Sequence, residues 1–206
     1  MTRDRDLTEK KILDAVGRIV ERLGFEAVGV NAVAAESGVS KVLIYRYFGS
    51  IDDLLSKYLE SNDFWLNYDF NNLPIETLQP LDKDQLKQFS QQLFRTFITK
   101  LRNSPALRKL YRWELSSSHP ALQSLRQRRE ETAQKIIGMV SRFAQIPLDD
   151  VAVFSTMITA TMSYLCILAD NCPIYNTLKI DSEEGWEKIM NSIDSIFEIL
   201  FDHKRF

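Results

Sequence analysis

The segment at residues 36–53, ESGVSKVLIYRYFGSIDD, concentrates side chains that can bind an anion or the edge of a nucleic-acid base. Lys41 and Arg46 carry positive charge, and the hydroxyl groups of Ser40 and Tyr45 can donate and accept hydrogen bonds. Such groups contact phosphates and base edges in protein–DNA complexes. The same stretch holds branched and aromatic apolar residues, which a purely solvated helix does not need. One face against protein and another against DNA would explain this mixture.

The pattern around this segment predicts two short helices joined by a glycine turn, over residues 30–37 and 40–47. Gly38 lies where the chain must turn sharply, and glycine adopts positive φ without strain. Ile44 and Phe48 are four residues apart, so they share the inward face of the second helix. Helices of about seven residues are not stable alone. We therefore expect both to pack on the helix that precedes them.

The outward face of the second short helix then carries Lys41, Val42, Tyr45 and Arg46. A compact helix-turn-helix with this outer face fits the major groove of DNA. Short helix pairs with a glycine turn also occur in proteins that do not bind DNA. The pattern by itself therefore leaves a DNA-binding and a purely structural interpretation open.

The whole stretch at residues 12–54 resembles the DNA-binding domain of the TetR family of transcriptional regulators. The matching pieces are ILDAVGRIVERLGFEAV, VNAVAAESGVSKVLIYRYF and SIDDLL. The rest of the chain fits the layout of this family in length and helix count only. The resemblance implies a homodimer, one DNA half-site for each subunit, and a C-terminal pocket for a small molecule that controls DNA binding.

By this resemblance, Ser40, Lys41, Tyr45 and Tyr47 fall where family members touch DNA, mostly at phosphates. Together with the outward-facing side chains, these positions form the predicted DNA-binding set: Ser40, Lys41, Val42, Leu43, Tyr45, Arg46 and Tyr47.

Several positions depart from the common family pattern. Val42 and Leu43 stand where a small residue and a threonine are frequent, and Ile51 replaces a frequent lysine. Residues 1–60 hold nine Lys and Arg against ten Asp and Glu, so this domain is not basic. Each phosphate contact that is lost makes the slope of log binding constant against log salt concentration shallower by about one, because about one counterion fewer is released. We expect weaker binding or more apolar contacts, with Val42 and Leu43 able to meet thymine methyl groups. The basic cluster at residues 3–11 is either a DNA-binding arm or an ordinary solvated terminus.

Composition excludes several classes of protein. The chain has 206 residues, of which 45% are hydrophobic and 26% charged, as in ordinary globular proteins. Its net charge of −2 argues against coating nucleic acid by bulk charge. The two cysteines, Cys166 and Cys172, form no paired metal-ligand set and suit reduced thiols. We find no signal peptide and no apolar run near the ~20 residues of a membrane span. We expect a cytoplasmic protein without a membrane partner.

Seven glycines, six prolines and recurrent helical spacing predict an all-α protein. We expect an N-terminal three-helix helix-turn-helix DNA-binding domain followed by a C-terminal helical domain for effector binding and dimerisation. The expected boundaries are 1–49 for the DNA-binding domain, 50–68 for a connecting helix, 69–84 for a loop, and 85–206 for the ligand-binding and dimerisation domain.

The helices expected within these regions follow from periodicity and from capping residues. Thr8 is the expected N-cap of the first helix, and Gly24 is its expected stop. Residues 171–182 are expected to form turns. The predicted helices span residues 8–23, 30–37, 40–47, 50–67, 85–102, 105–116, 121–144, 148–170 and 182–204.

The helices expected at residues 148–170 and 182–204 carry a surplus of apolar surface. The first is apolar nearly all round, and the second has a continuous apolar stripe. In the resembled family two such helices form a four-helix dimer interface. From the residues alone, an intramolecular core pair is the alternative. The predicted interface residues are Phe154, Ile158, Met162, Leu165, Ile189, Ile193, Phe197 and Leu200.

Two charged residues, Glu114 and Arg129, lie on helix faces that are otherwise apolar. A lone buried charge is too costly to keep. Either one of them binds a polar group of the effector, or Glu114 pairs with Arg129 or with Arg126; we favour the structural pair. The predicted effector pocket consists of Trp65, Tyr68, Phe94, Phe97, Tyr111, Glu114, Arg129, Phe143 and Tyr164.

Three functions compete at this stage. The first is a ligand-responsive regulator, a repressor released from its operator by a small, largely apolar effector. The alternative is a dimeric small-molecule binding protein whose DNA-binding domain is weakened or non-functional. The third is an all-helical enzyme, but two histidines, no clustered metal ligands and no nucleophile with an evident base argue against it. We expect no enzymatic activity, no cofactor and no metal.

Overall fold

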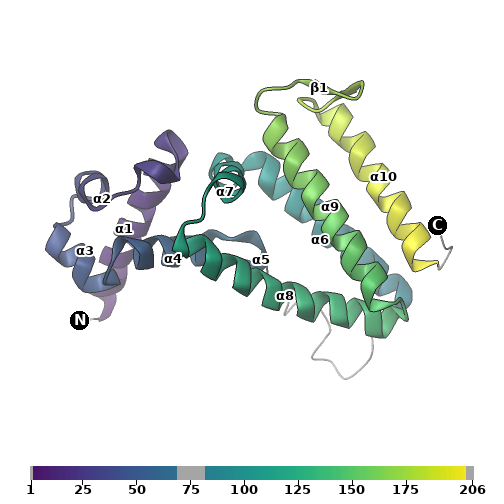
Figure 1. Cartoon of the computed structure of the whole chain (residues 1–206), viewed down its shortest axis with the longest axis horizontal. Coiled ribbons are helices and arrows are strands. Elements are labelled where there is room, and N and C mark those ends of the chain that lie inside the picture. The colour runs from purple at the N-terminus through teal and green to yellow at the C-terminus, as the bar shows by residue number, and fades with distance from the viewer. Residues whose placement is uncertain (1, 69–81, 203–206) are drawn as a thin grey trace. The chain divides into compact units, whose positions relative to one another are not determined.

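The computed structural model describes the backbone of residues 2–68 and 82–202, and side chains from residue 5 onward. Within this part of the chain the protein is all-α apart from one short hairpin, which confirms the predicted fold class (Figure 1). Most of the loop expected at residues 69–84 lies outside the described residues.

Contacts divide the chain into two compact units. Unit 1 contains Met1–Asn67 and Ser104–Glu130, and unit 2 contains Tyr68–Asn103 and Glu131–Phe206. The two units separate near residue 68, and residues 104–130 belong to the unit that contains the N-terminal helices. The expected functional division, with ligand binding and dimerisation at 85–206, stays a prediction.

Unit 1 is built from one long helix, several short ones and part of a second long helix. Local sequence explains the short helices: Ser40 Oγ accepts the Leu43 N–H at 3.3 Å, and Ser50 Oγ accepts the Asp53 N–H at 3.0 Å. Gly38 has φ +65° and ends the helix before it. The elements are α1 (Thr2–Leu23), η1 (Phe25–Ala27), α2 (Val30–Ser37), α3 (Lys41–Phe48), α4 (Ile51–Asn62), α5 (Phe64–Asn67), α7 (Pro105–Ser116) and the first part of α8 (Pro120–Ala144).

The two short helices α2 and α3 pack as expected, through a shared apolar core with α1 and α4. Two salt bridges also join α2 to α1, because Glu36 pairs with Arg18 at 2.7 Å and with Arg22 at 3.0 Å. Burial, rather than helix propensity, therefore holds these eight-residue helices. Fully buried side chains of this core include Ile12, Val16, Val33, Ile44 and Leu54.

Two predicted boundaries in unit 1 are wrong. The first helix begins at Thr2 rather than Thr8, so Thr8 is not its N-cap and residues 3–11 form no extended arm. The helix expected at residues 50–67 is two helices, because Asp63 has an extended backbone between α4 and α5. The Asp63 carboxylate accepts the Leu66 N–H at 3.1 Å, and this side-chain cap starts the new helix.

Unit 2 has α6 as its central helix, with α9 and α10 packed against it. Basic residues of α6 face acidic residues of α10, so ion pairs reinforce this contact along its length. The pairs are Lys87–Glu198 at 2.6 Å, Arg102–Glu183 at 2.5 Å, and Arg95–Asp194. The elements are α6 (Lys83–Asn103), the second part of α8, α9 (Leu148–Leu168), β1 (Ile174–Tyr175), β2 (Leu178–Lys179) and α10 (Glu183–Phe201).

The segment expected to form only turns contains an antiparallel hairpin, β1 and β2 (Figure 1). Its tip, Asn176 and Thr177, has positive φ at both residues, which suits the twist of a two-residue hairpin loop. Ile180, the residue after β2, is fully buried, and its carbonyl oxygen accepts a 2.7 Å hydrogen bond from Trp186 Nε1. The first turn of α10 therefore anchors the hairpin.

Helix α9 corrects the expectation that no apolar run approaches the length of a membrane span. Its 21 residues are long and apolar enough to cross a membrane by length and composition alone. About a third of the most apolar window is buried within the protein. Core helices of soluble proteins pass the same test, so a single helix of this kind is weak evidence for a membrane.

The contact between α10 and the hairpin generates a stability prediction. A Cβ atom at Gly185 would lie 1.8 Å from the Lys179 carbonyl oxygen, which is a severe overlap. We expect Gly185→Ala to destabilise the fold by about 2 kcal/mol, or to lower Tm by about 4–8 °C. Thermal unfolding followed by circular dichroism measures this shift.

Gly138→Ala is the matched control, because Gly138 lies within α8 and a Cβ there meets no atom within 4 Å. Alanine is the better helix former, so this variant should gain about 0.5–1 kcal/mol. Equal shifts of Tm in both variants would contradict the described packing of α10 on the hairpin.

Candidate nucleic-acid interface

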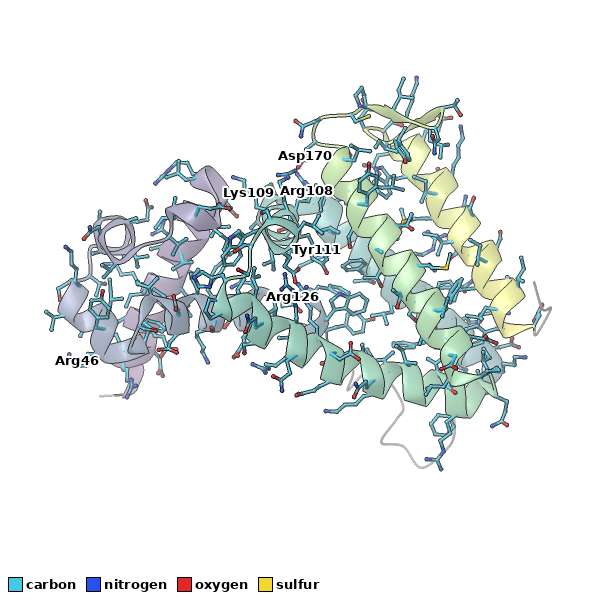
Figure 2. The ribbon with its side chains drawn as sticks, viewed as in Figure 1. Arg46, Arg108, Lys109, Tyr111, Arg126 and Asp170 are labelled. Atoms are coloured by element: carbon cyan, nitrogen blue, oxygen red, sulfur yellow. The ribbon has the colours of Figure 1, made fainter. Side chains whose placement is uncertain are left out.

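The outward face of α3 carries the predicted combination of side chains. Lys41, Val42, Tyr45 and Arg46 are all exposed, and Val42 keeps 78% of its surface accessible. Arg46 lies at the outer edge of α3 (Figure 2). Ile44, between them in sequence, is fully buried. The helix therefore presents cations, a phenol and one apolar group on the side opposite the core.

The other predicted DNA-binding residues have partners within unit 1. Ser40 is exposed, but its hydroxyl caps α3. Leu43 and Tyr47 are half-buried, and the Arg5 guanidinium lies 5.6 Å from the centre of the Tyr47 ring. These residues hold α3 in place as well as bordering its outer face.

The charges of this region fall into two groups. Arg18 and Arg22 share the single carboxylate of Glu36, which compensates one of their two charges. Lys41 and Arg46 form no ion pair within the part of the chain that the structure describes. Although the N-terminal domain is nearly neutral as a whole, its outer helix therefore offers two free cations to an anion.

Residues of the α7–α8 loop and of α8 hold α4, the helix that follows α3, at both of its ends. The first of these contacts strengthens when its histidine is protonated, while the other two join permanent charges. The three contacts are His119 Nε2 to Asp52 Oδ1 at 3.4 Å, Arg128 Nη1 to Glu60 Oε2 at 2.5 Å, and Arg129 Nε to Asp63 Oδ2 at 2.8 Å. We call this set the α4 clamp.

Arg129 is the centre of a buried cluster of charges and aromatic rings in unit 1. Its Nη1 donates to Glu114 Oε2 at 2.7 Å, and its guanidinium lies 4.9 Å from the centre of the Tyr111 ring. The Tyr111 hydroxyl accepts a 3.1 Å hydrogen bond from Trp65 Nε1. The predicted pairing of Glu114 with Arg129 is confirmed. Asp63, which is 1% exposed, is the partner that sequence reasoning missed.

A signal for Asp63 was present in the sequence. An Asp at the end of one helix that precedes an aromatic pair and a new helical turn is a typical N-cap. Arg126 also joins this region: its Nη2 donates to the Glu114 carbonyl oxygen at 2.6 Å, and Figure 2 shows it on α8.

Burial and charge change the proton affinity of this cluster. Desolvation raises the pKa of Tyr111 to about 12. Burial alone would lower the pKa of Arg129, but Tyr111, Asp63 and Glu114 together raise it above its ordinary value. Near neutral pH the guanidinium is therefore charged and the Tyr111 hydroxyl is neutral.

The predicted effector-pocket residues are divided between the two units, so their grouping into one pocket stays a prediction. Those in unit 1 are Trp65, Tyr111, Glu114 and Arg129, around the buried cluster; those in unit 2 are Tyr68, Phe94, Phe97, Phe143 and Tyr164. Phe97 is a core residue, whereas Phe143 and Tyr164 are exposed.

Unit 2 contains a small apolar pocket between α6, α8, α9 and α10. Among its lining residues are Phe94, Ile137, Val140 and Phe197, and only Phe94 belongs to the predicted set. The lining includes no charged side chain. Within residues 2–68 and 82–202, no three His, Cys, Asp or Glu side chains are grouped to hold a metal ion.

The predicted dimer-interface residues are largely buried within unit 2 itself. Ile158, Met162, Leu165, Ile189, Ile193 and Phe197 are buried, and Phe154 and Leu200 are half-buried. They therefore have little surface left for a second subunit. Besides Leu148 at its first position, the exposed large apolar side chains of α9 are Val153, Met157 and Tyr164, on another side of the helix.

Comparisons with known proteins find one matching family model and similar solved structures. Residues 12–58 match a family model described as bacterial regulatory proteins, tetR family. A comparison with curated proteins found no match.

Similar solved structures include a TetR family transcription regulator from Marinobacter aquaeolei VT8, at 18% identity and TM-score 0.61, covering 98% of this chain and 97% of that one. Salmonella enterica GusR is similar at 16% identity and TM-score 0.59, with 95% of each chain covered. A putative tetR family regulator from Shewanella sp. PV-4 has 19% identity and TM-score 0.56, with 94% and 95% covered. At these identities the structural likeness shows the fold.

The buried cluster generates a second stability prediction. Arg129→Met leaves the buried Asp63 carboxylate without its counter-charge, which typically costs about 3–5 kcal/mol. We expect a lower denaturation midpoint in urea, measured by circular dichroism.

Arg128→Met is the control, because Arg128 pairs with Glu60 near the surface and such pairs contribute up to about 1 kcal/mol. If the two variants unfolded at the same urea concentration, the Arg129 cluster would not be the structural centre that we describe.

Proposed function

The chain is a transcription regulator of the tetR family, and from this premise we propose that it is a repressor whose DNA binding is controlled by a small apolar ligand. The observation that carries the DNA-binding part is the outer face of α3, where Lys41 and Arg46 are exposed and free of ion pairs among the described residues. Free cations beside a phenol suit the phosphates and base edges of a major groove.

In this proposal α3 is the recognition helix of the helix-turn-helix. Lys41 and Arg46 bind phosphates, and Tyr45 donates its hydroxyl to a phosphate or a base edge. Ser40 and Tyr47 border the phosphate contacts, while the half-buried Leu43 supports the helix from within. Each subunit then binds one half-site of the operator.

We further propose that the protein acts as a homodimer. Regulators of this family usually form dimers. The exposed apolar residues Val153, Met157 and Tyr164 follow one another along α9 at helical spacing, and a second copy can cover them. This assigns the dimer contact to a side of α9 that the fold of the single subunit leaves open.

The apolar pocket of unit 2 is our candidate for the effector site. Its lining is aliphatic and aromatic apart from the hydroxyls of Ser90 and Ser155, and Ser90 Oγ already donates to the Leu86 carbonyl oxygen at 2.8 Å. An uncharged, largely apolar ligand suits such a lining, because a charged ligand would lose its hydration without gaining a partner.

Helix α8 connects this pocket with the α4 clamp along the chain. Its residues Ile136, Ile137 and Val140 line the pocket, and its Arg128 and Arg129 bind α4. A ligand that favours one position of α8 would therefore favour one position of α4 and of the recognition helix before it. DNA affinity would change by this shift of population.

The second candidate function is that of a small-molecule binding protein whose N-terminal helix-turn-helix domain binds DNA weakly or not at all. It is favoured by the neutral charge of residues 1–60 and by Ile51, which begins α4 where a lysine is frequent in the resembled family. In that case the protein would bind its ligand without binding an operator.

DNA selection from a random duplex library, followed by fluorescence anisotropy at several salt concentrations, tests the proposal. We expect saturable binding to a two-fold symmetric site. Lys41→Ala should weaken it and flatten the salt slope by about one ion per half-site, because this variant no longer neutralises one phosphate. Tyr45→Ala should weaken binding while changing the salt slope less.

Lys135→Ala is the matched control, since Lys135 is an exposed cation of α8 in unit 2. It should leave both affinity and salt slope unchanged. The absence of any selected sequence would exclude the repressor function and favour the second candidate function.

The α4 clamp generates a separate prediction. Glu60→Gln removes the pair with Arg128, so α4 is held less firmly and the DNA-competent arrangement is less populated. We expect operator affinity to fall about threefold with an unchanged salt slope. Loss of the Glu60 negative charge by itself would raise the affinity for DNA phosphates. A fall in operator affinity is therefore the effect expected from the α4 clamp and not from the change in charge.

Glu187→Gln serves as the control for charge, because Glu187 is exposed on α10. Both variants should unfold within about 1 kcal/mol of the parent. An operator affinity in Glu60→Gln equal to or above that of the parent would remove the clamp from the mechanism.

A further inference from the structure

One residue on the outer face of α3 differs from its neighbours in chemistry. Lys41, Tyr45 and Arg46 all end in groups that form hydrogen bonds, whereas Val42 has none. Val42 is 78% exposed, and the adjacent apolar residue, Leu43, is half-buried in the fold. Val42 is therefore the apolar side chain that this face offers to a partner.

The position of Val42 in the helix favours contact with bases. It is the second residue of α3, and the first residues of a recognition helix are those that reach base edges in helix-turn-helix proteins. The Ser40 cap and the buried Ile44 fix the start of the helix on either side of it. Because valine branches at Cβ, one χ1 rotamer dominates in a helix, so its methyl groups are held in place.

The major groove offers an apolar side chain few partners. Purines present acceptors and the adenine amino group there, and cytosine presents an amino donor; thymine alone among the four standard bases presents a methyl group, at C5. A valine pressed on an amino group would leave that donor without an acceptor, which costs affinity.

We propose that Val42 makes the protein select a 5-methylpyrimidine at one position of each operator half-site. This inference rests on the proposed DNA-binding function and adds a specificity-determining residue to it. Thymine and 5-methylcytosine carry the same methyl group, so both are sources of this chemistry. The phosphate contacts of Lys41 and Arg46 then supply affinity without sequence preference, and Val42 supplies discrimination.

The test starts from the duplex selected by the full-length protein. Repeating the selection with Val42→Ala identifies the position at which the preference for thymine disappears. Val42 is exposed and alanine is the better helix former, so this variant is expected to fold. At that position thymine is then replaced by uracil, which removes only the methyl group.

We expect uracil to weaken binding of the parent protein about fourfold per half-site, the contribution of one buried methyl group. Val42→Ala should bind the thymine and uracil duplexes equally. Leu115→Ala is the control, because Leu115 is an exposed apolar residue of α7, outside α3, and it should keep the preference for thymine.

A third duplex carries 5-methylcytosine at the same position, opposite guanine. Tighter binding to thymine than to 5-methylcytosine identifies thymine as the source, and the reverse identifies methylated DNA, whereas the comparison with uracil tests readout of the methyl group itself. An equal ratio of thymine to uracil affinity in the parent and in Val42→Ala would overturn this inference alone. Failure of the parent protein to select any sequence would overturn the proposed function as well.

Discussion

The pairing of Arg129 with the buried carboxylate of Asp63 is the interaction on which the arrangement of unit 1 depends. One oxygen of Asp63 caps α5 and the other binds Arg129, so a single carboxylate ends one helix, starts the next and ties both to α8. Glu114 and Tyr111 attach α7 to the same guanidinium. Since a buried charge without a partner is strongly destabilising, this cluster admits few alternative arrangements of the helices that meet there.

The distribution of cations separates the structural part of unit 1 from its candidate interface. The buried Arg129 is matched by the carboxylates of Asp63 and Glu114, and the exposed Arg18 pairs with Glu36. Lys41 and Arg46, on the outer face of α3, are not matched among the described residues. A domain with nearly equal numbers of acidic and basic residues can therefore present a local basic face. Net charge alone is a poor guide to DNA binding here, because it averages over both groups.

Unit 2 combines two kinds of helix contact. Ion pairs join α6 to α10, and apolar packing of α9 on α6 leaves another side of α9 exposed. The basic residues of α6 bind the acidic residues of α10, while α9 packs on α6 through apolar contacts. Because α9 is apolar nearly all round, packing on one side leaves Val153, Met157 and Tyr164 exposed on another. The same surplus explains why α9 passes a test for membrane helices and why we assign a second copy of the chain to its open side.

The sequence alone determined the local features of this protein. Helices α2 and α7, the Ser40 cap and the Gly38 turn follow from signals within a few residues, and the N-terminal motif was recognisable for the same reason. Only the tertiary structure decided which side of α9 is buried, that the chain between α9 and α10 forms a hairpin, and that Asp63 pairs with Arg129. Asp63 and Arg129 are 66 positions apart, and no periodicity connects them. Local hydrogen bonds and helical spacing depend on residues that are close in sequence, whereas the partner of a buried charge depends on how the helices pack.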